Sequence, residues 1–157
     1  MVAAAAPWVE AGPFRAHLRH LMDVGGLDAT EVAVLAGVPP RMATSLVRGR
    51  NGRPVRRISP AHARALIRVG ATDVRDLRTR QVPAAESRLR LRRMLAGRGG
   101  GPPALAVELG VAASSLDELA HPGTAWCSAL VALRLLTASR TRPGAVEAPP
   151  VPLGVAA

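Results

Sequence analysis

The stretch EVAVLAGVPPRMATSLVR, residues 31–48, decides the fold. Its apolar residues recur at helical spacing on both sides of a turn, Gly37-Val38-Pro39. Asp28 begins the first helix, because Glu31 three residues later completes a capping-box pattern. Pro40 suits the first position of the second helix, where its missing N–H costs nothing, and this helix extends to about Arg48. The stretch therefore predicts two short helices joined by a tight turn.

The spacing within these helices is that of a helix-turn-helix. Two helices that cross steeply need a small residue where their backbones approach and a glycine in the turn. Ala33 and Gly37 occupy those places, the fifth and the ninth counted from Ala29. The apolar positions that hold the crossing angle are filled by Val32, Ala36, Val38, Ala43 and Leu46. In such a motif the second helix enters the major groove of DNA.

Helices are predicted on both sides of this pair. One precedes it and ends at Gly25-Gly26, and its Arg15 and Arg19 point away from the apolar face. Another begins at Ser59-Pro60 and ends at Gly70. The residues expected to face inward on these helices and on the first helix of the pair are Phe14, Leu18, Leu21, Met22, Val32, Leu35, Ala36, Ala63, Leu66 and Ile67.

The same order recurs later in the chain. Residues 17–49 align without a gap with residues 90–122, at an offset of 73. Leu18 then matches Leu91, and Gly37-Val38 matches Gly110-Val111. The motif positions of the second copy are Ala106 and Gly110, with Leu105, Leu109, Val111, Leu116 and Leu119 as its apolar residues. A helix over 125–139 takes the place of 60–69, so we infer an internal duplication.

These patterns predict an all-α protein with two tandem small helical helix-turn-helix units. We expect a flexible N-terminus over 1–13, the first unit over 14–80, a second, degenerate unit over 81–139 and a disordered, proline-rich tail over 140–157. Strand signals are almost absent. Residues 71–77 are expected to form a short helical turn, residues 78–87 a linker around Pro83, and residues 97–101 a flexible connection.

Positive charge is concentrated directly after the first motif. Residues 41–80 hold eleven arginines and two acids, a net charge of +9, whereas residues 1–40 carry −2 and residues 81–157 carry +3. All 21 basic residues are arginine, whose fork-shaped group binds phosphates and guanine edges with two hydrogen bonds. A GC-rich genome accounts for the choice of arginine but not for its clustering. The charge favours a polyanionic partner for the first unit.

The outward face of the helix over 40–48 carries the residues expected to contact bases. An arginine can bond the O6 and N7 atoms of guanine, and a hydroxyl can bond a base or a phosphate. The predicted base contacts are Arg41, Thr44, Ser45 and Arg48. The plainer alternative is that these residues form the solvated side of a helix.

The basic loop over 49–58 is the second expected DNA contact. Its Gly-Arg-Pro core, residues 52–54, is extended and narrow and resembles the centre of an AT-hook, which lies in the minor groove. The alternative is a flexible loop that touches phosphates. Residues expected to contact the backbone or the minor groove are Arg50, Asn51, Arg53, Arg56 and Arg57 in the loop, and Arg64 and Arg68 in the helix that follows.

The second unit differs at the positions that would meet DNA. Its equivalent helix displays Ser114, Ser115, Asp117, Glu118 and His121. The two carboxylates would repel phosphates, so we do not expect this helix to read DNA. Its last helix is apolar nearly all round, which indicates a central helix of a small core or one paired with another chain. We expect the second unit to pack against the first or to form a homodimer through residues 88–138.

Several classes of function are disfavoured by composition. The absence of lysine removes the phosphate-binding lysine of nucleotide-binding loops and Schiff-base chemistry. The single cysteine, Cys127, allows no internal disulfide, and no Ser/His/Asp set is recognisable. His17 and His20 lack an evident third metal ligand. The longest apolar run, residues 125–138, is too short to span a bilayer. We expect no catalytic site, metal, cofactor or membrane partner.

The chain resembles a known family at these residues. HLRHLM at 17–22 and EVAVLAGVPPRMATSLVRGRNGRPVRRISPAHARALIRV at 31–69 look like small helix-turn-helix DNA-binding proteins of actinobacteria and their phages. RLRLRRMLAGRGGGPPALAVELGV at 88–111 is similar to the degenerate second helix-turn-helix often found in them. The resemblance covers roughly residues 14–138 and implies a DNA-binding regulator.

The expected function is sequence-specific binding of double-stranded DNA, as a transcriptional regulator in the cytoplasm at the nucleoid. Two alternatives are open. The first is an adaptor that uses the same fold to bind a protein of the transcription machinery. The second is a nonspecific nucleoid-associated or RNA-associated protein.

Overall fold

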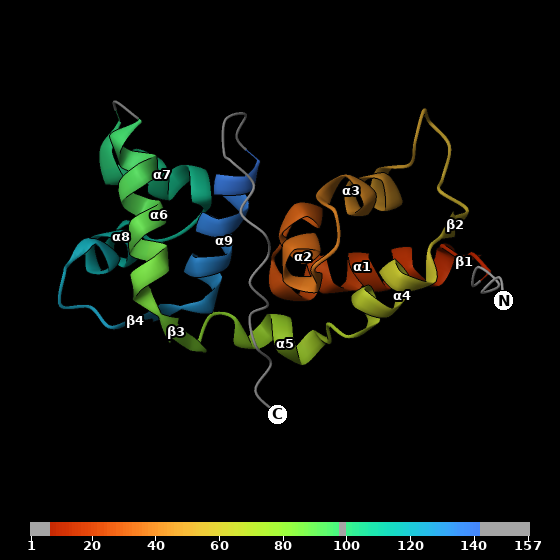
Figure 1. Ribbon diagram of the computed structural model, residues 1–157, viewed down its shortest axis with the longest axis horizontal. Coiled ribbons are helices and arrows are strands. Elements are labelled where there is room, and N and C mark those ends of the chain that lie inside the picture. The colour runs from red at the N-terminus through yellow and green to blue at the C-terminus, as the bar shows by residue number, and fades with distance from the viewer. Residues whose placement is uncertain (1–6, 98–99, 142–157) are drawn as a thin grey trace, which may run out of the picture. The chain divides into compact units, whose positions relative to one another are not determined.

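The computed structural model describes residues 7–97 and 100–141 and is mostly helical (Figure 1). The chain divides into two compact units, the first reaching Arg75 and the second beginning at Asp76. The elements of unit 1 are β1 (Val9–Glu10), α1 (Gly12–Gly25), α2 (Ala29–Ala36), α3 (Pro40–Arg48), β2 (Arg57–Ile58), α4 (Pro60–Ile67) and α5 (Ala71–Asp76), whose last residue lies in unit 2. Those of unit 2 are β3 (Gln81–Pro83), α6 (Ala84–Ala96), α7 (Gly101–Leu109), α8 (Ala113–Ala120), β4 (Trp126–Ser128) and α9 (Ala129–Arg140).

Local signals explain where the helices of unit 1 begin and end. Asp28 and Glu31 form the predicted capping box, because the Asp28 carboxylate accepts from the Glu31 N–H at 2.8 Å and the Glu31 carboxylate accepts from the Asp28 N–H at 2.9 Å. Gly37 ends α2 in the left-handed conformation, with φ 71° and ψ 29°. Pro40 is the first residue of α3, and Ser59 caps α4 by accepting from the His62 N–H at 3.2 Å.

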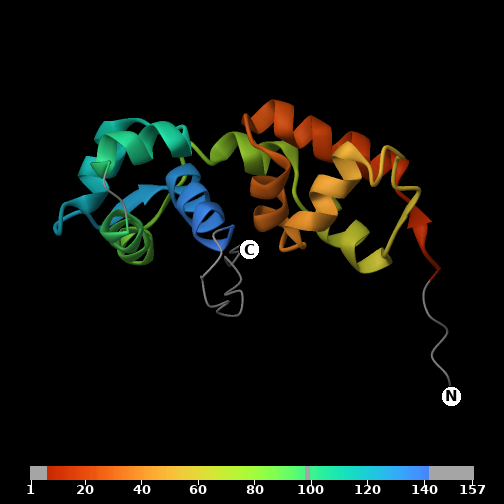
Figure 2. The same ribbon diagram turned by 90° about the horizontal axis from the view of Figure 1, so that it is seen from above.

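The core of unit 1 lies between α1, α2, α3 and α4. Helix α1 runs across one side of α2 and α3 (Figure 2), and it also contacts α4. The most deeply buried side chains on these four helices are Leu18, Leu21, Val32, Ala33, Ala43, Leu46 and Leu66. The predicted inward positions of α1 are therefore confirmed for Leu18 and Leu21, whereas Phe14 and Met22 are half-buried.

Two helices bury different faces from those predicted. In α2, Ala33 and Val34 are buried, while Leu35 and Ala36 are half-buried. This helix contacts α1, α3 and α4, so its burial extends around more of its circumference than one apolar stripe. In α4, Ile67 is 65% exposed, because the helix ends there and Leu66 and Val69 take the inward positions.

Short strands form where the sequence predicts flexible segments. Within the predicted flexible N-terminus, β1 pairs with β2 through Val9 and Ile58, and Ala11 is fully buried. The predicted linker over 78–87 contains β3, which pairs with β4 through Val82 and Cys127, and the first turn of α6. The description of the chain as all-α is therefore wrong in this detail. Strands of two or three residues are too short to show an alternating pattern.

The two units repeat the same order: strand, three helices, strand, helix. Gly110 repeats the left-handed turn of Gly37, with φ 64° and ψ 32°, and the Val38 N–H and Val111 N–H donate to the Ala33 and Ala106 carbonyls at 2.9 and 3.0 Å. These pairs lie 73 residues apart. After α3 and α8, equivalent residues lie 69 residues apart. The serines that cap α4 and α9, Ser59 and Ser128, show this shorter spacing. The connection before the second strand is thus four residues shorter in unit 2.

An arginine on the first helix joins three elements in each unit. In unit 1, Arg15 Nε donates to the Leu46 carbonyl at 2.8 Å, and Arg15 Nη2 donates to the Val55 carbonyl. In unit 2, Arg88 Nε donates to the Leu119 carbonyl at 3.0 Å, and its Nη2 donates to the Thr124 carbonyl. Each arginine binds the end of the third helix and the connection beyond it.

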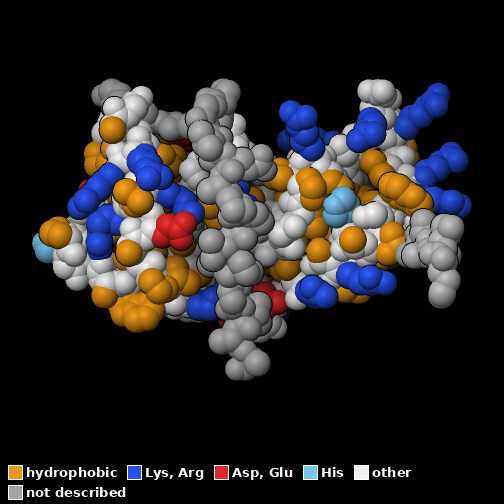
Figure 3. Space-filling view, viewed as in Figure 1, with side chains coloured by type: hydrophobic (Ala, Val, Ile, Leu, Met, Phe, Trp, Pro, Cys, Tyr) orange, Lys and Arg blue, Asp and Glu red, His pale blue; other side chains and the backbone are white. Residues whose placement is uncertain are grey.

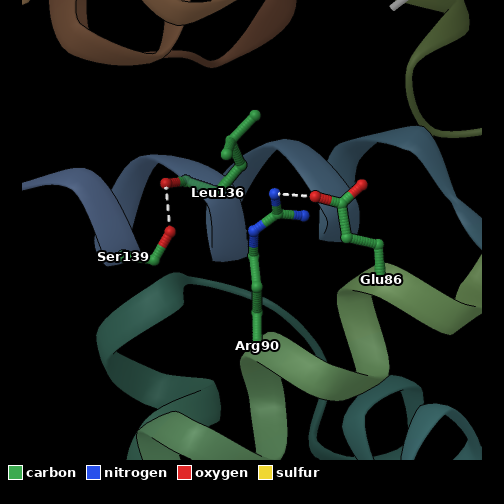
Figure 4. Close-up of polar contacts among 4 residues, drawn as sticks. All are labelled: Glu86, Arg90, Leu136 and Ser139. Atoms are coloured by element: carbon green, nitrogen blue, oxygen red, sulfur yellow. Dashed lines mark hydrogen bonds and ion pairs between the residues drawn. The ribbon is translucent and has the colours of Figure 1, made fainter. Parts of the chain in front are cut away.

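The core of unit 2 is built on α6, α7, α8 and α9. Its buried side chains include Leu91, Met94, Leu105, Leu116, Leu119, Val131 and Leu135. Burial raises the pKa of the Cys127 thiol above its ordinary value. Arg90 pairs with Glu86 one turn earlier on α6, and on α9 the partly buried Ser139 Oγ donates to the Leu136 carbonyl at 2.7 Å (Figure 4).

Some features predicted from sequence lie outside the described residues. Residues 142–157, which make up most of the predicted disordered tail, are among them, as are residues 1–6 and 98–99. Among the helices that the structure does describe, none is both long and apolar enough to cross a membrane.

Replacing Arg15 with methionine should destabilise unit 1 by about 1.5–3 kcal/mol, because two carbonyls lose a charged donor. Hydrogen exchange measured residue by residue on the full chain would show faster exchange in α1 and α3. Arg88→Met should have the same effect in α6 and α8 alone. Arg92→Met, on an exposed position of α6, serves as the control. Unchanged exchange in both anchor variants would contradict this role.

Candidate nucleic-acid interface

The candidate interface begins with α3. Pro39 precedes the helix in an extended conformation, and Ala43 and Leu46 are fully buried beneath it. The predicted base contacts share one face of this helix, because they are spaced by about one and two helical turns. Counted from Arg41, Thr44 is three, Ser45 four and Arg48 seven residues further along. The two arginines are exposed and the two hydroxyl residues are half-buried.

The C-terminal end of α3 is held by arginines from α1. Arg15 binds the Leu46 carbonyl, and Arg19 Nη2 donates to the Val47 carbonyl at 3.1 Å. Cations are favourable at this end of a helix, where carbonyls lack partners within the helix. The prediction that both arginines point away from the apolar face overlooked this role. The sequence did contain a signal for the role of Arg15, since Arg88 lies 73 residues later, at the offset of the internal repeat. The alignment of the two copies begins at His17 and therefore left this pair out.

The basic loop forms a tight hairpin turn directly after α3. The Arg50 N–H donates to the Arg53 carbonyl at 2.8 Å, and the Arg53 N–H donates to the Arg50 carbonyl at 3.1 Å. Between them Asn51 and Gly52 both have positive φ, 52° and 72°, as a type I′ turn requires. We call residues 50–53 the arginine hairpin. The closed turn and the positive φ of Gly52 overturn the expectation of an extended Gly-Arg-Pro core over residues 52–54. All four residues of the hairpin are exposed.

The segment after the arginine hairpin is attached to the start of the chain. The Val55 carbonyl accepts from Arg15, and the Arg56 carbonyl accepts from the Ala11 N–H at 2.8 Å. Arg57 lies opposite Glu10 in the pairing of β1 with β2. The side chains of Arg56 and Arg57 are exposed. The hairpin is therefore fixed at both ends, although its tip faces solvent.

The structure brings most of the predicted site residues together, but not all of them. Helix α3 and the loop after it lie along the upper edge of unit 1 in Figure 1. In the same view, Figure 3 shows arginine side chains gathered at the upper right of the molecule. Within the described part of the chain, no acidic side chain forms an ion pair with an arginine of α3 or of the loop. Arg64 and Arg68 are exposed, but α4 lies along the lower edge of unit 1.

The equivalent surface of unit 2 has different chemistry. Asp117 and Glu118 are exposed on α8, and the connection to β4 lacks the four residues of the hairpin. Trp126, which is 59% exposed, stands where unit 1 has Arg57. A cavity of about 220 Å³ opens beside it, lined by residues that include Ser115, Glu118, Trp126 and Cys127. Within the described residues, α8 and the connection to β4 contain no arginine.

The histidines of α1 have no metal-binding geometry. Over residues 7–97 and 100–141, no three histidine, cysteine or acidic side chains lie close enough to hold a metal ion. His17 Nε2 lies 3.0 Å from the Val69 carbonyl, a contact that joins α1 to the end of α4. The position of His17 is thus explained by packing within unit 1.

Comparison with known proteins gives no match to the chain among family models, curated proteins or solved structures.

The glycines of the loop offer a matched test of the arginine hairpin. At Gly49, with φ 84° and ψ 177°, an added Cβ would lie 2.6 Å from the Arg53 carbonyl oxygen, whereas at Gly52 it would meet nothing within 4 Å. Gly52→Ala should cost about 1–2 kcal/mol from its left-handed backbone alone. Gly49→Ala should cost about 1–3 kcal/mol from its backbone conformation, and the contact with Arg53 adds to that.

Chemical unfolding of both variants, with the exchange rates of the Arg50 and Arg53 amides, would measure this difference. Equal losses of stability would mean that the hairpin does not close onto Gly49.

Proposed function

We propose that the chain is a sequence-specific double-stranded DNA-binding protein that acts as a transcriptional regulator. In this proposal α2 and α3 form a helix-turn-helix, α3 enters the major groove, and the loop over 49–58 contacts the adjoining backbone or groove. Unit 2 is then a degenerate second helix-turn-helix that supports unit 1 or forms a homodimer through residues 88–138. Such a protein would act in the cytoplasm, at the nucleoid.

One observation carries the proposal. The helix after the Gly37 turn exposes Arg41 and Arg48 on one face, and a rigid loop with four further exposed arginines follows it immediately. Acids of the chain do not neutralise these groups anywhere in the described residues. A dense, unpaired and preorganised set of guanidinium groups suits a polyanion, because binding releases condensed counterions and orders few side chains.

The most informative experiment is selection of bound duplexes from a random pool. A single enriched sequence supports sequence-specific reading, and a palindrome also supports a dimer, since the symmetry of paired half-sites mirrors that of the protein. Binding without enrichment would favour the nonspecific alternative. Capture of a transcription protein that survives nuclease treatment, without binding to duplexes, would favour the adaptor.

Arginines of α3 and of the loop should differ in their effect on specificity. Arg48→Ala should reduce affinity for the selected duplex by about tenfold to a hundredfold and relax the preference for one base pair. Arg56→Ala should weaken selected and random duplexes equally, because a phosphate contact carries no sequence information. Titrations of both variants against both duplexes measure this. Equal losses on the two duplexes for Arg48→Ala would refute its role in base reading.

Affinity should depend steeply on salt. If about five to seven phosphates are neutralised, the logarithm of the association constant should fall with the logarithm of salt concentration at a slope of roughly −4 to −6. Titrations of the full chain over a series of salt concentrations would measure the slope. A slope near zero is incompatible with binding through the arginines of α3 and the loop.

A further inference from the structure

The arginine hairpin is the main addition that distinguishes the framework of unit 1 from that of unit 2. The anchors Arg15 and Arg88, the glycine turns and the capping serines all have counterparts in both units. The spacing of equivalent residues changes from 73 to 69 between the third helix and the second strand. Four residues are therefore extra in unit 1, and the closed turn over 50–53 accounts for them.

The hairpin places two like charges opposite each other. Arg50 and Arg53 form an isolated antiparallel bridge, so their side chains leave the same face of the turn. Like charges in directly opposite positions destabilise a β-pair. Both arginines are exposed, and neither forms an ion pair in the described part of the chain. An anionic partner would remove this repulsion.

The tip is narrow as well as charged. Asn51 and Gly52 carry one short side chain between them, and their conformations are fixed by the two hydrogen bonds of the turn. The base of the hairpin is held by Arg15, which binds carbonyls on both sides of it. Two arginines are thus presented at the end of a small rigid projection that loses little entropy on binding.

The position of the hairpin at the end of α3 indicates which part of a duplex it meets. A helix seated in the major groove ends at a phosphate backbone, and the minor groove lies beyond that backbone. Where A·T pairs narrow the minor groove, its negative potential deepens and attracts arginine. Guanidinium groups are also weakly hydrated, so they lose less than ammonium groups on entering such a groove.

We infer that the arginine hairpin inserts Arg50 or Arg53 into the minor groove beside the segment read by α3, and that it selects a narrow, A·T-rich flank. This inference rests on the proposed function, since it assumes that α3 occupies the adjacent major groove. The arginine hairpin would then be a second determinant of DNA sequence preference, and it would act through the width of the minor groove. Unit 2 has no segment equivalent to this hairpin.

The test uses the full chain and a duplex recovered by selection from a random pool. Replacing adenine by 2,6-diaminopurine in the flank adds an amino group to the minor groove and leaves the hydrogen-bonding groups of the major groove unchanged. Wild-type affinity should fall roughly tenfold on this substitution, as for a poorly matched base pair. The double variant Arg50→Ala/Arg53→Ala should bind the two duplexes equally. Arg78→Ala/Arg80→Ala, which removes the same charge from exposed positions, should keep the wild-type difference.

The outcomes separate the inference from the proposed function. Equal affinity of the wild type for the normal and substituted duplexes would overturn the inference while leaving duplex binding intact. Arg50→Lys/Arg53→Lys should lose most of the discrimination against 2,6-diaminopurine, and full retention of discrimination by this variant would also overturn the inference. Absence of wild-type binding to every duplex would overturn the proposed function and the inference together.

Discussion

The candidate interface depends on one partly buried set of hydrogen bonds, those of Arg15. Its guanidinium group reaches from α1 to the Leu46 carbonyl at the end of α3 and to the Val55 carbonyl beyond the arginine hairpin. These carbonyls lie 31 and 40 residues away along the chain. Without the side chain, the last turn of α3 and the base of the loop would each contain a carbonyl that needs another donor. The hydrogen bonds of Arg15 thus hold the end of α3 and the base of the loop in their relative positions.

The second unit shows which parts of this arrangement are framework and which are surface. Arg88 repeats the anchor on the Leu119 and Thr124 carbonyls, and Gly110 repeats the turn of Gly37. The exposed positions change in character. Asp117 and Glu118 replace Thr44 and Ser45, Ser114 and His121 replace Arg41 and Arg48, and Trp126 replaces Arg57. A duplicated scaffold can keep its internal hydrogen bonds while its outer face acquires another chemistry. This separation supports a different partner for unit 2.

Local signals made much of unit 1 predictable from sequence. The Asp28 capping box, the Gly37 turn and Pro40 at the start of α3 each depend on a few adjacent residues, and each lies where it was predicted. The burial of Val34 and the exposure of Ile67 depend on which neighbours surround a helix, so periodicity alone did not identify them. Arg15 was missed because its partners are distant in sequence. The arginine hairpin has an Asn-Gly signal, but the overlapping Gly-Arg-Pro favoured an extended segment.

The two bonds of Arg15 also fix a length. The Arg15 side chain binds both the end of α3 and the base of the loop. The distance between the exposed face of α3 and the arginine hairpin therefore cannot change without breaking one of these hydrogen bonds. If both elements contact one duplex, the protein measures a constant step from one groove to the next. Sites in which the two recognised segments are separated by one additional base pair would then satisfy either contact, but not both at once.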